Sequence, residues 1–245
     1  MARCKIEVAN QVIDLETVYN RSCGLCQMFY TNKPENIKVS IKQEDIDQAK
    51  EQHRKIYGSS TEPWDGFIEF SIVFRKISEE LIEHDTFAFH GAVIGLHNQA
   101  YLFTAPSGTG KTTHIIKWVK KCAETIVING DKPFIKIRQK GMNPLVFGSP
   151  WAGKENLYTN TAMPLKSVIL MERADDNEIE KIPFVQAFTF LLGQVYRPND
   201  ESKMRKTLQL LKKMDGCVTF WRFRCNNFKE DCFDVAYNAL VKDER

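Results

Sequence analysis

The chain has 245 residues, of which 43% are apolar and 27% charged, so it can bury a full hydrophobic core without disulfide bonds. The 34 Lys and Arg residues nearly balance the 31 Asp and Glu residues, and no concentrated basic block stands out, which argues against nucleic acid or a membrane surface as a partner. Because no apolar run reaches the roughly 18 residues of a membrane span and no secretion signal opens the chain, we expect a cytoplasmic protein with its seven scattered cysteines reduced.

The first residues of the chain contain short segments in which apolar and polar residues alternate. The segments 5–9 and 37–41 both follow this period of two, which is typical of half-buried strands. Residues 1 to about 45 are therefore expected to form short extended pieces.

A break in the pattern follows these strands. Residues 43–57 are polar with few apolar positions, and residues 58–63 are rich in turn-forming residue types, so we expect a connection there. These features predict a small β-rich cap over residues 1–60 and a larger domain over residues 61–245.

The larger domain opens with a predicted helix. Apolar residues recur at helical spacing from Phe67 to Ile82, and Asp65 is a suitable N-terminal capping residue. Two β-rich runs follow at 87–96 and 100–104, and the residues between them are typical of a hairpin turn. The second run leads directly into a glycine-rich segment.

Strands and helices alternate after the glycine-rich segment. The predicted strands are 125–128, 134–137, 145–147, 167–171 and 217–223. The predicted helices are 114–121 and, approximately, 183–196, 200–214 and 229–240. This alternation predicts a domain of the α/β class.

The glycine-rich segment, Ala105-Pro-Ser-Gly-Thr-Gly-Lys-Thr112, matches the phosphate-binding pattern at every place except the first, where Ala105 replaces Gly. Alanine is acceptable there if its φ is negative. Gly108 and Gly110 stand where a side chain would block backbone N–H groups from phosphate oxygens. The motif also has the strand before it and the helix after it that a P-loop requires.

The expected chemistry of this segment follows from charge. Converging N–H groups and the positive end of a helix favour a polyphosphate. Lys111 is expected to reach the β- and γ-phosphates and the Thr112 hydroxyl to ligate Mg²⁺, so ATP and Mg²⁺ are the expected cofactors. The expected nucleotide-binding residues of the segment are Ser107, Gly108, Thr109, Gly110, Lys111, Thr112 and Thr113.

A kinase also needs a carboxylate that binds the metal or receives a proton. Asp131 follows the predicted strand 125–128, at the position where an open α/β sheet presents its ligand groups. Asp131 is therefore the candidate for both roles. The alternative is a plain turn, because the residues around Asp131 are all of types that favour turns.

These residues together resemble a known family. Phe89-His-Gly-Ala-Val93, the glycine-rich segment, Val127-Ile-Asn-Gly-Asp-Lys-Pro133 and Gly148-Ser-Pro-Trp-Ala-Gly-Lys154 are similar, in this order, to the catalytic domain of HPr kinase/phosphorylase. They resemble the nucleotide-binding core of phosphoenolpyruvate carboxykinases more distantly. The resemblance covers about a quarter of the chain.

The resemblance implies a mixed β-sheet with flanking helices, in which a hairpin precedes the P-loop. It implies that His90 lies beside the phosphates and that Asp131 is the second of two adjacent aspartates that hold Mg²⁺ and assist proton removal. Gly130 stands in place of the first aspartate. It also makes a homo-oligomer plausible.

Two further patterns leave alternatives open. Lys154 follows a glycine in a loop expected near the nucleotide, where its ammonium can bind phosphate as a point charge; a solvated surface lysine is the alternative. Cys23 and Cys26 have the spacing of a metal site without a second pair. Cys4 can supply a third thiol, and a redox dithiol is an alternative, but we favour ordinary reduced thiols.

The sequence thus predicts an ATP-dependent kinase that transfers the γ-phosphate to a serine-like hydroxyl of a small molecule or peptide. Asp131, Lys111 and His90 are its expected catalytic residues, and Thr112 and Asp131 its expected metal ligands. The alternative is a non-catalytic ATP-binding sensor or scaffold protein, which the missing aspartate at Gly130 suggests.

Overall fold

The computed structural model describes residues 1–58 and 63–242, and the chain divides into two compact units, Met1–His84 and Asp85–Arg245. The sequence predicted this boundary at residue 60, whereas the structure has it between His84 and Asp85. The reason is helix α3 (Asp65–Ile82), which packs against β3 (Ile37–Ser40) and other elements of the first unit. The buried stripe of α3 has its partners there, so the helix belongs to that unit.

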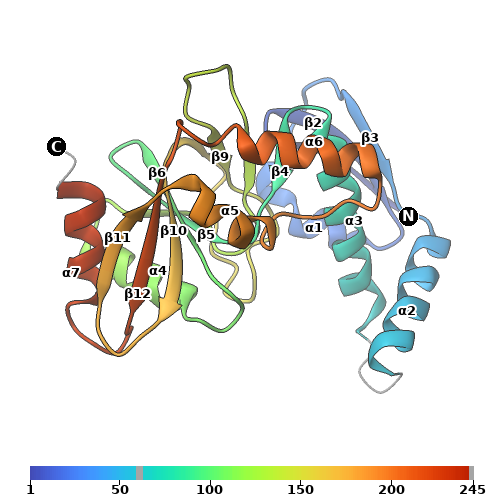
Figure 1. The fold of residues 1–245 in the computed structure, drawn as a ribbon. Helices are drawn as coiled ribbons and strands as arrows, with labels where there is room; N and C mark the ends of the chain where they lie inside the picture. Colours follow the sequence, from blue (N-terminus) through green and yellow to red (C-terminus); the bar gives the residue numbers. More distant parts are fainter. Residues whose placement is uncertain (59–62, 243–245) are drawn as a thin grey trace. The chain divides into compact units, whose positions relative to one another are not determined.

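The first unit combines a small sheet with helices (Figure 1). Its remaining elements are β1 (Ala2–Val8), β2 (Gln11–Thr17), α1 (Asn20–Leu25), a 3₁₀ turn (Gln27–Phe29) and α2 (Gln43–Tyr57). Strand β2 is central, antiparallel to β1 and parallel to β3. The two strands expected from alternation, β1 and β3, are confirmed, whereas β2 and α1 were not predicted.

Helix α2 corrects the expectation of a connecting segment over residues 43–57. Only Ile46 is buried along it, which explains why its sequence shows so little periodicity. Acidic residues occupy its first turn and basic residues its last turn, an arrangement that favours the helix dipole. The helix ends at Gly58, whose φ is 79°. Residues 59–62 of the expected turn lie outside the described residues.

Helix α3 was predicted from its apolar spacing, and that prediction is confirmed. Its N-cap is Trp64, one residue before the expected Asp65. The helix also buries Glu69 completely. The Glu69 carboxylate accepts hydrogen bonds from the backbone N–H groups of Val18 (2.6 Å) and Tyr19 (3.2 Å) and from the Ser22 hydroxyl (2.5 Å). It thereby ties α3 to the connection between β2 and α1.

Replacing Glu69 by alanine should lower the free energy of unfolding by about 2–4 kcal/mol, because buried donors lose their acceptor. Urea denaturation followed by circular dichroism measures the change. The control is Glu44→Ala, an exposed position on α2, which should change stability by no more than about 0.5 kcal/mol. Equal effects of the two substitutions would contradict the structural role of Glu69.

The second unit contains the larger sheet. Its strands are β4 (Thr86–Ala88), β5 (Ala92–Leu96), β6 (Gln99–Thr104), β7 (Ile126–Asn129), β8 (Phe134–Lys136), β9 (Leu145–Phe147), β10 (Ala162–Arg173), β11 (Glu178–Ile182) and β12 (Thr219–Cys225). Its helices are α4 (Lys111–Lys121), α5 (Phe184–Leu192), α6 (Glu201–Lys212) and α7 (Cys232–Tyr237), followed by a π-helical turn (Asn238–Lys242). Strand β11 was not predicted: three of its five residues are charged, and only Ile182 is buried.

The sheet is mixed, as expected from the resemblance. Strand β10 lies parallel to β6 on one side and to β12 on the other, while β5 and β7 are antiparallel to their neighbours. The start of β10 pairs instead with β9, which continues through β8 to β4. A class of α/β fold with a mixed sheet is therefore confirmed.

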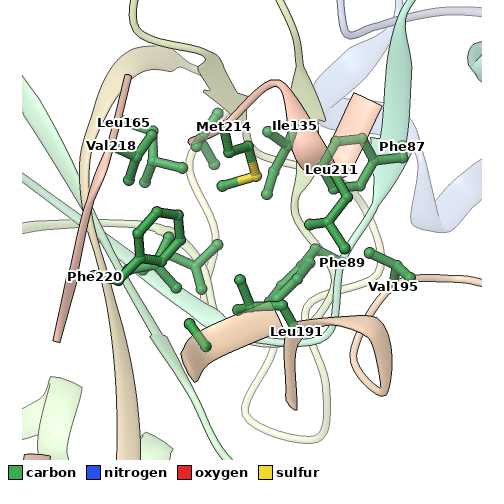
Figure 2. Packing of buried hydrophobic residues seen from close by; sticks show 14 of the residues in the cluster. Phe87, Phe89, Ile135, Leu165, Leu191, Val195, Leu211, Met214, Val218 and Phe220 are labelled. Atoms are coloured by element: carbon green, nitrogen blue, oxygen red, sulfur yellow. The ribbon is translucent and has the colours of Figure 1, made fainter. Parts of the chain in front are cut away.

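Helices cover both faces of this sheet. Leu102 of β6 and Val168 of β10 share a core cluster with α5 and α6, and Figure 2 shows side chains from the strands and these helices converging on that cluster. The alternate residues Phe103 and Ile169 share a second cluster with α4 and α7. This alternation is the period of two that a sheet buried on both faces requires. None of the described helices is long and apolar enough to cross a membrane.

Strands β5 and β6 form the expected hairpin, and its turn residues His97 and Asn98 have φ values of 49° and 59°, which is the conformation of a two-residue hairpin turn. The expected strand 87–96 is broken in two. The break falls at His90 and Gly91, where the backbone N–H of His90 bonds to the Gln194 carbonyl (2.8 Å). The interruption leaves His90 at the start of β5, beside the end of β6.

Candidate active site

The glycine-rich loop joins the end of β6 to the start of α4. Gly108 and Gly110 have φ values of 78° and 109°, which L side chains rarely adopt. A Cβ on Gly110 would also lie 2.6 Å from the Asn227 amide nitrogen. Ala105 is fully buried and is not among the positive-φ residues, so alanine is compatible with the first position of the loop.

Lys111 is the first residue of α4 and folds back toward the loop. Its Nζ donates a hydrogen bond to the Ala105 carbonyl (2.8 Å), and the residue is only 8% exposed. Burial lowers the pKa of Lys111, and the negative charge of Asp131 partly opposes this effect. The positive charge of Lys111 thus lies in a partly desolvated position, where it attracts an anion more strongly than it would in water.

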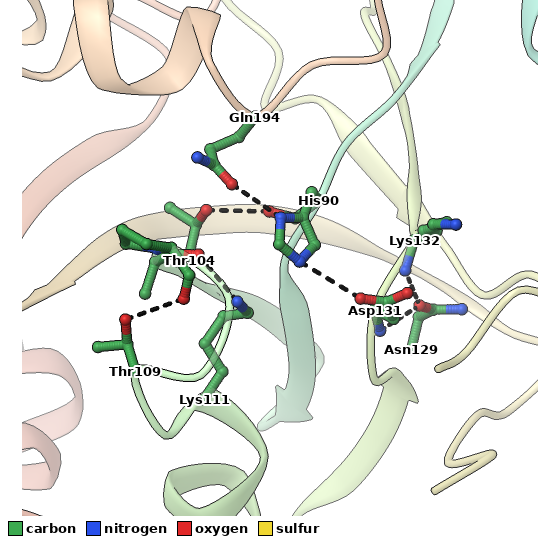
Figure 3. A network of polar contacts seen from close by, with 10 residues as sticks. His90, Thr104, Thr109, Lys111, Asn129, Asp131, Lys132 and Gln194 are labelled. Atoms are coloured by element: carbon green, nitrogen blue, oxygen red, sulfur yellow. Dashed lines mark hydrogen bonds and ion pairs between the residues drawn. The ribbon is translucent and has the colours of Figure 1, made fainter. Parts of the chain in front are cut away.

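His90 and Asp131 lie next to each other (Figure 3). His90 Nε2 is 3.4 Å from Asp131 Oδ1, and His90 Nδ1 is 2.9 Å from Gln194 Oε1. Burial acts to raise the pKa of the Asp131 carboxyl, but the hydrogen bond with His90 and the charges of Lys132, His90 and Lys111 outweigh burial. The pKa of Asp131 therefore falls below its ordinary value, and the carboxyl is ionised at neutral pH.

Asp131 is held by a turn at the end of β7. The Asn129 side-chain oxygen accepts hydrogen bonds from the backbone N–H groups of Asp131 (2.9 Å) and Lys132 (2.7 Å). The Asn129 amide nitrogen donates to the Ser149 carbonyl and hydroxyl, both at 3.0 Å. The turn that the sequence offered as an alternative is therefore present, and Asn129 fixes the backbone of Asp131 within it.

The loop after β9 packs against this turn. A Cβ on Gly153 would lie 3.1 Å from the Asp131 Cβ, so the loop passes directly beside the carboxylate. Lys154, the next residue, is exposed. Lys154 therefore follows directly after the residue that lies beside Asp131, and its own side chain is at the surface.

Gly130 has no room for the second carboxylate that the resemblance implies. A Cβ at Gly130 would lie 2.9 Å from the Ala152 carbonyl oxygen and 3.3 Å from that of Leu157. Both atoms belong to the backbone, so neither can move aside as a flexible side chain would. The glycine is required by the packing of the adjacent loop.

Gly130→Ala and Gly130→Asp should each lower the free energy of unfolding by about 1–3 kcal/mol through overpacking, measured by urea denaturation. Gly24→Ala is the control. Gly24 lies in α1, and no atom stands within 4 Å of the place that a Cβ would take, so the substitution should be neutral or stabilising by up to about 1 kcal/mol. A tolerated Gly130→Asp would show that the loop can make room for a second acid.

Two residues that sequence reasoning missed border the other side of the glycine-rich loop. The Arg173 guanidinium, at the end of β10, donates to the Gly108 carbonyl (2.5 Å), and the Asn227 amide donates to the Gly110 carbonyl (3.2 Å). Both line a cavity of about 770 Å³, together with Thr109, Thr113 and Phe228. No local pattern marks these residues, because they come from distant segments of the chain.

The remaining predicted residues lie on the loop and the first turn of α4. Ser107, Gly108 and Thr113 are exposed, and Thr112 is partly buried. The Thr109 hydroxyl donates to the Pro106 carbonyl (2.9 Å). Within the described parts of the chain, no group of three or more His, Cys, Asp and Glu residues is arranged to hold a metal ion.

Comparisons with known proteins point to a distant structural likeness. No protein family model and no curated protein matches the sequence. The chain is similar to the HPr(Ser) kinase/phosphatase from Coxiella burnetii, with a TM-score of 0.36 and 10% sequence identity over 64% of this chain and 99% of that one. A likeness of this size identifies neither the family nor the activity of the chain.

Proposed function

We propose that the chain binds ATP with Mg²⁺ on the loop 105–113 and transfers the terminal phosphate to a hydroxyl group of a small molecule or peptide. The observation that carries the proposal is the meeting of three groups at one edge of the sheet. The glycine-rich loop and its buried Lys111 follow β6, whereas Asp131 follows β7 and has His90 beside it. The charge of Asp131 acts on Lys111.

The loop supports binding of a polyphosphate. Its two left-handed glycines and the N-terminus of α4, an 11-residue helix, offer backbone N–H groups without intrahelical partners. Lys111 adds a positive charge, and its attraction for a phosphate is stronger in this buried position than in water. The neighbouring cavity of about 770 Å³ is large enough for a nucleoside. Phe228 on its wall is 99% exposed, so its ring is available for stacking on a base.

The same groups fit a magnesium ion. Mg²⁺ is usually held by one or two carboxylates together with substrate phosphates and water, so it does not need three clustered protein ligands. Asp131 and Thr112 are the residues that would hold it, and the ion would neutralise charge on the transferred phosphate.

The chain's own residues would then position the reactants. The acceptor hydroxyl forms the new O–P bond as the bond from the γ-phosphorus to the ADP oxygen breaks, and the hydroxyl proton passes to the Asp131 carboxylate. His90 orients that carboxylate, and Gln194 orients His90. Lys111 stabilises the charge that builds up on the phosphate oxygens.

A second function is supported by Gly130. Because the packing around Gly130 excludes a second carboxylate, the site has a single acid of lowered pKa, which is a weak base. This observation favours a protein that binds ATP as a sensor or scaffold and does not turn it over.

Incubation with ATP labelled at the γ-phosphate and a panel of hydroxyl compounds and serine-containing peptides tests the two functions. Transfer of label to an acceptor, in a single turnover, supports the kinase. Tight ATP binding with no transfer and no hydrolysis supports the sensor. A chain that binds no nucleotide at all would contradict both.

A further inference from the structure

Three cysteines of the first unit lie close together, and the pair in contact is not the one that their spacing in the sequence indicates. Cys4 lies on β1, Cys23 lies on α1, and Cys26 is the C-cap of α1. The Cys4 and Cys23 sulfur atoms are 2.7 Å apart, with the Cys4 thiol donating to Cys23. Sequence spacing alone would pair Cys23 with Cys26.

The surroundings of the three sulfur atoms differ. Cys26 is fully buried, and burial raises the pKa of its thiol to about 12, so it remains protonated and unreactive. The hydrogen bond from Cys4 lowers the pKa of Cys23 and raises the pKa of Cys4. Cys23 therefore carries the thiolate character of the pair and can act as the base that takes the Cys4 proton.

Cys4 is the accessible member of the pair. It lines a cavity of about 410 Å³, whereas Cys23 is only 5% exposed. Arg3 and Lys5 line the same cavity, but each is ion-paired, Arg3 with Asp14 and Lys5 with Glu35. A small disulfide of either charge can thus reach Cys4 without opening the fold.

We propose that Cys4 and Cys23 form a redox-active dithiol, which a small disulfide such as oxidised glutathione converts into a disulfide bond between β1 and α1. The Cys23 thiolate takes the Cys4 proton along their hydrogen bond as the Cys4 sulfur attacks the oxidant. This step forms a mixed disulfide at Cys4 and releases one glutathione thiolate. Cys23 loses its proton and attacks the Cys4 sulfur, releasing the second.

The exchange balances. Two protein thiols give up two electrons and two protons, the protein gains one S–S bond, and oxidised glutathione becomes two glutathione molecules. The new bond joins residues 19 positions apart, so it restricts the unfolded chain and should raise the melting temperature of the protein. None of this depends on nucleotide binding.

The test uses the full-length chain, fully reduced and then treated with oxidised glutathione. Remaining thiols are alkylated, and digestion with mass spectrometry maps the bonds. The free thiol count should fall from seven to five, because a Cys4–Cys23 bond consumes two. A Cys23–Cys26 bond, or stable glutathione adducts at Cys4 with no internal bond, would overturn the proposal.

Matched variants extend the test. Cys26→Ala should form the Cys4–Cys23 bond at the same rate as the parent protein. In Cys4→Ser, the six remaining cysteines should stay free thiols under the same treatment. The oxidised parent should melt at a higher temperature than the reduced parent, and Cys4→Ser should show no such shift. If Cys26→Ala does not fold, the mapped bonds of the parent protein still decide the question. Equal shifts in the parent and in Cys4→Ser would overturn the proposal.

Discussion

Replacing Lys111 by methionine should weaken ATP binding by about 10- to 100-fold, because a hydrogen bond from a charged group to phosphate contributes about 1.5–3 kcal/mol. Phosphate transfer should fall further, by about 100- to 1,000-fold, because the lysine stabilises charge that develops during the reaction. Methionine keeps the length of the aliphatic chain in this buried position. Isothermal titration calorimetry measures binding, and label transfer measures the reaction.

Lys120→Met is the matched control. Lys120 lies on the same helix and is exposed, so its loss removes the same charge from α4 without changing the loop. It should bind ATP with nearly the affinity of the parent. Melting temperatures of both variants confirm that they are folded. If Lys111→Met binds ATP as tightly as the parent, the loop is not the triphosphate site, and both proposed functions lose their basis.

Local chemistry explains which parts of the site the sequence could predict. The glycine-rich loop lies between a strand and a helix that are its immediate neighbours in sequence. The hairpin before it depends on two residues, His97 and Asn98, that tolerate positive φ. Such features depend on nearby residues only, so a pattern in one segment is enough to indicate them.

The parts that sequence patterns missed are contacts between distant segments. Gln194 meets His90 across 104 residues, and Arg173 meets the glycine-rich loop across 65. The residues next to Gln194 and Arg173 in the sequence form no motif that would mark either of them as part of a site. The resemblance to a family implied separate roles for His90 and Asp131 near the phosphates. Their direct contact was not predicted, because nothing in either segment indicates it.

The close packing around Gly130 also could not be predicted from the sequence. A glycine in a turn is expected for its backbone freedom, but Gly130 does not have a positive φ. It is needed because carbonyl groups of the loop after β9 approach it closely. The glycine at position 130 is thus coupled to the path of the loop after β9, and a substitution at this one position would not change that path.

Replacing Asp131 by asparagine separates the kinase from the sensor. If Asp131 receives the hydroxyl proton, Asp131→Asn should lower the transfer rate by about 100- to 10,000-fold. ATP binding should weaken much less, because Lys111 and the loop amides remain. Asparagine nearly preserves the volume of the side chain beside Gly153, so the turn held by Asn129 should persist. Single-turnover transfer and calorimetry give the two quantities.

The control for this substitution is Asp215→Asn, an exposed position after α6, which should leave transfer and binding unchanged. Stability against pH provides an independent check. Because the folded-state pKa of Asp131 lies below its ordinary value of 3.8, its carboxylate stabilises the fold above about pH 4, and this stabilisation is lost as the pH falls through the lower folded-state value. The difference in unfolding free energy between parent and Asp131→Asn should therefore shrink on acidification. A difference that does not depend on pH would contradict the ionised, His90-bonded carboxylate on which the proposed transfer depends.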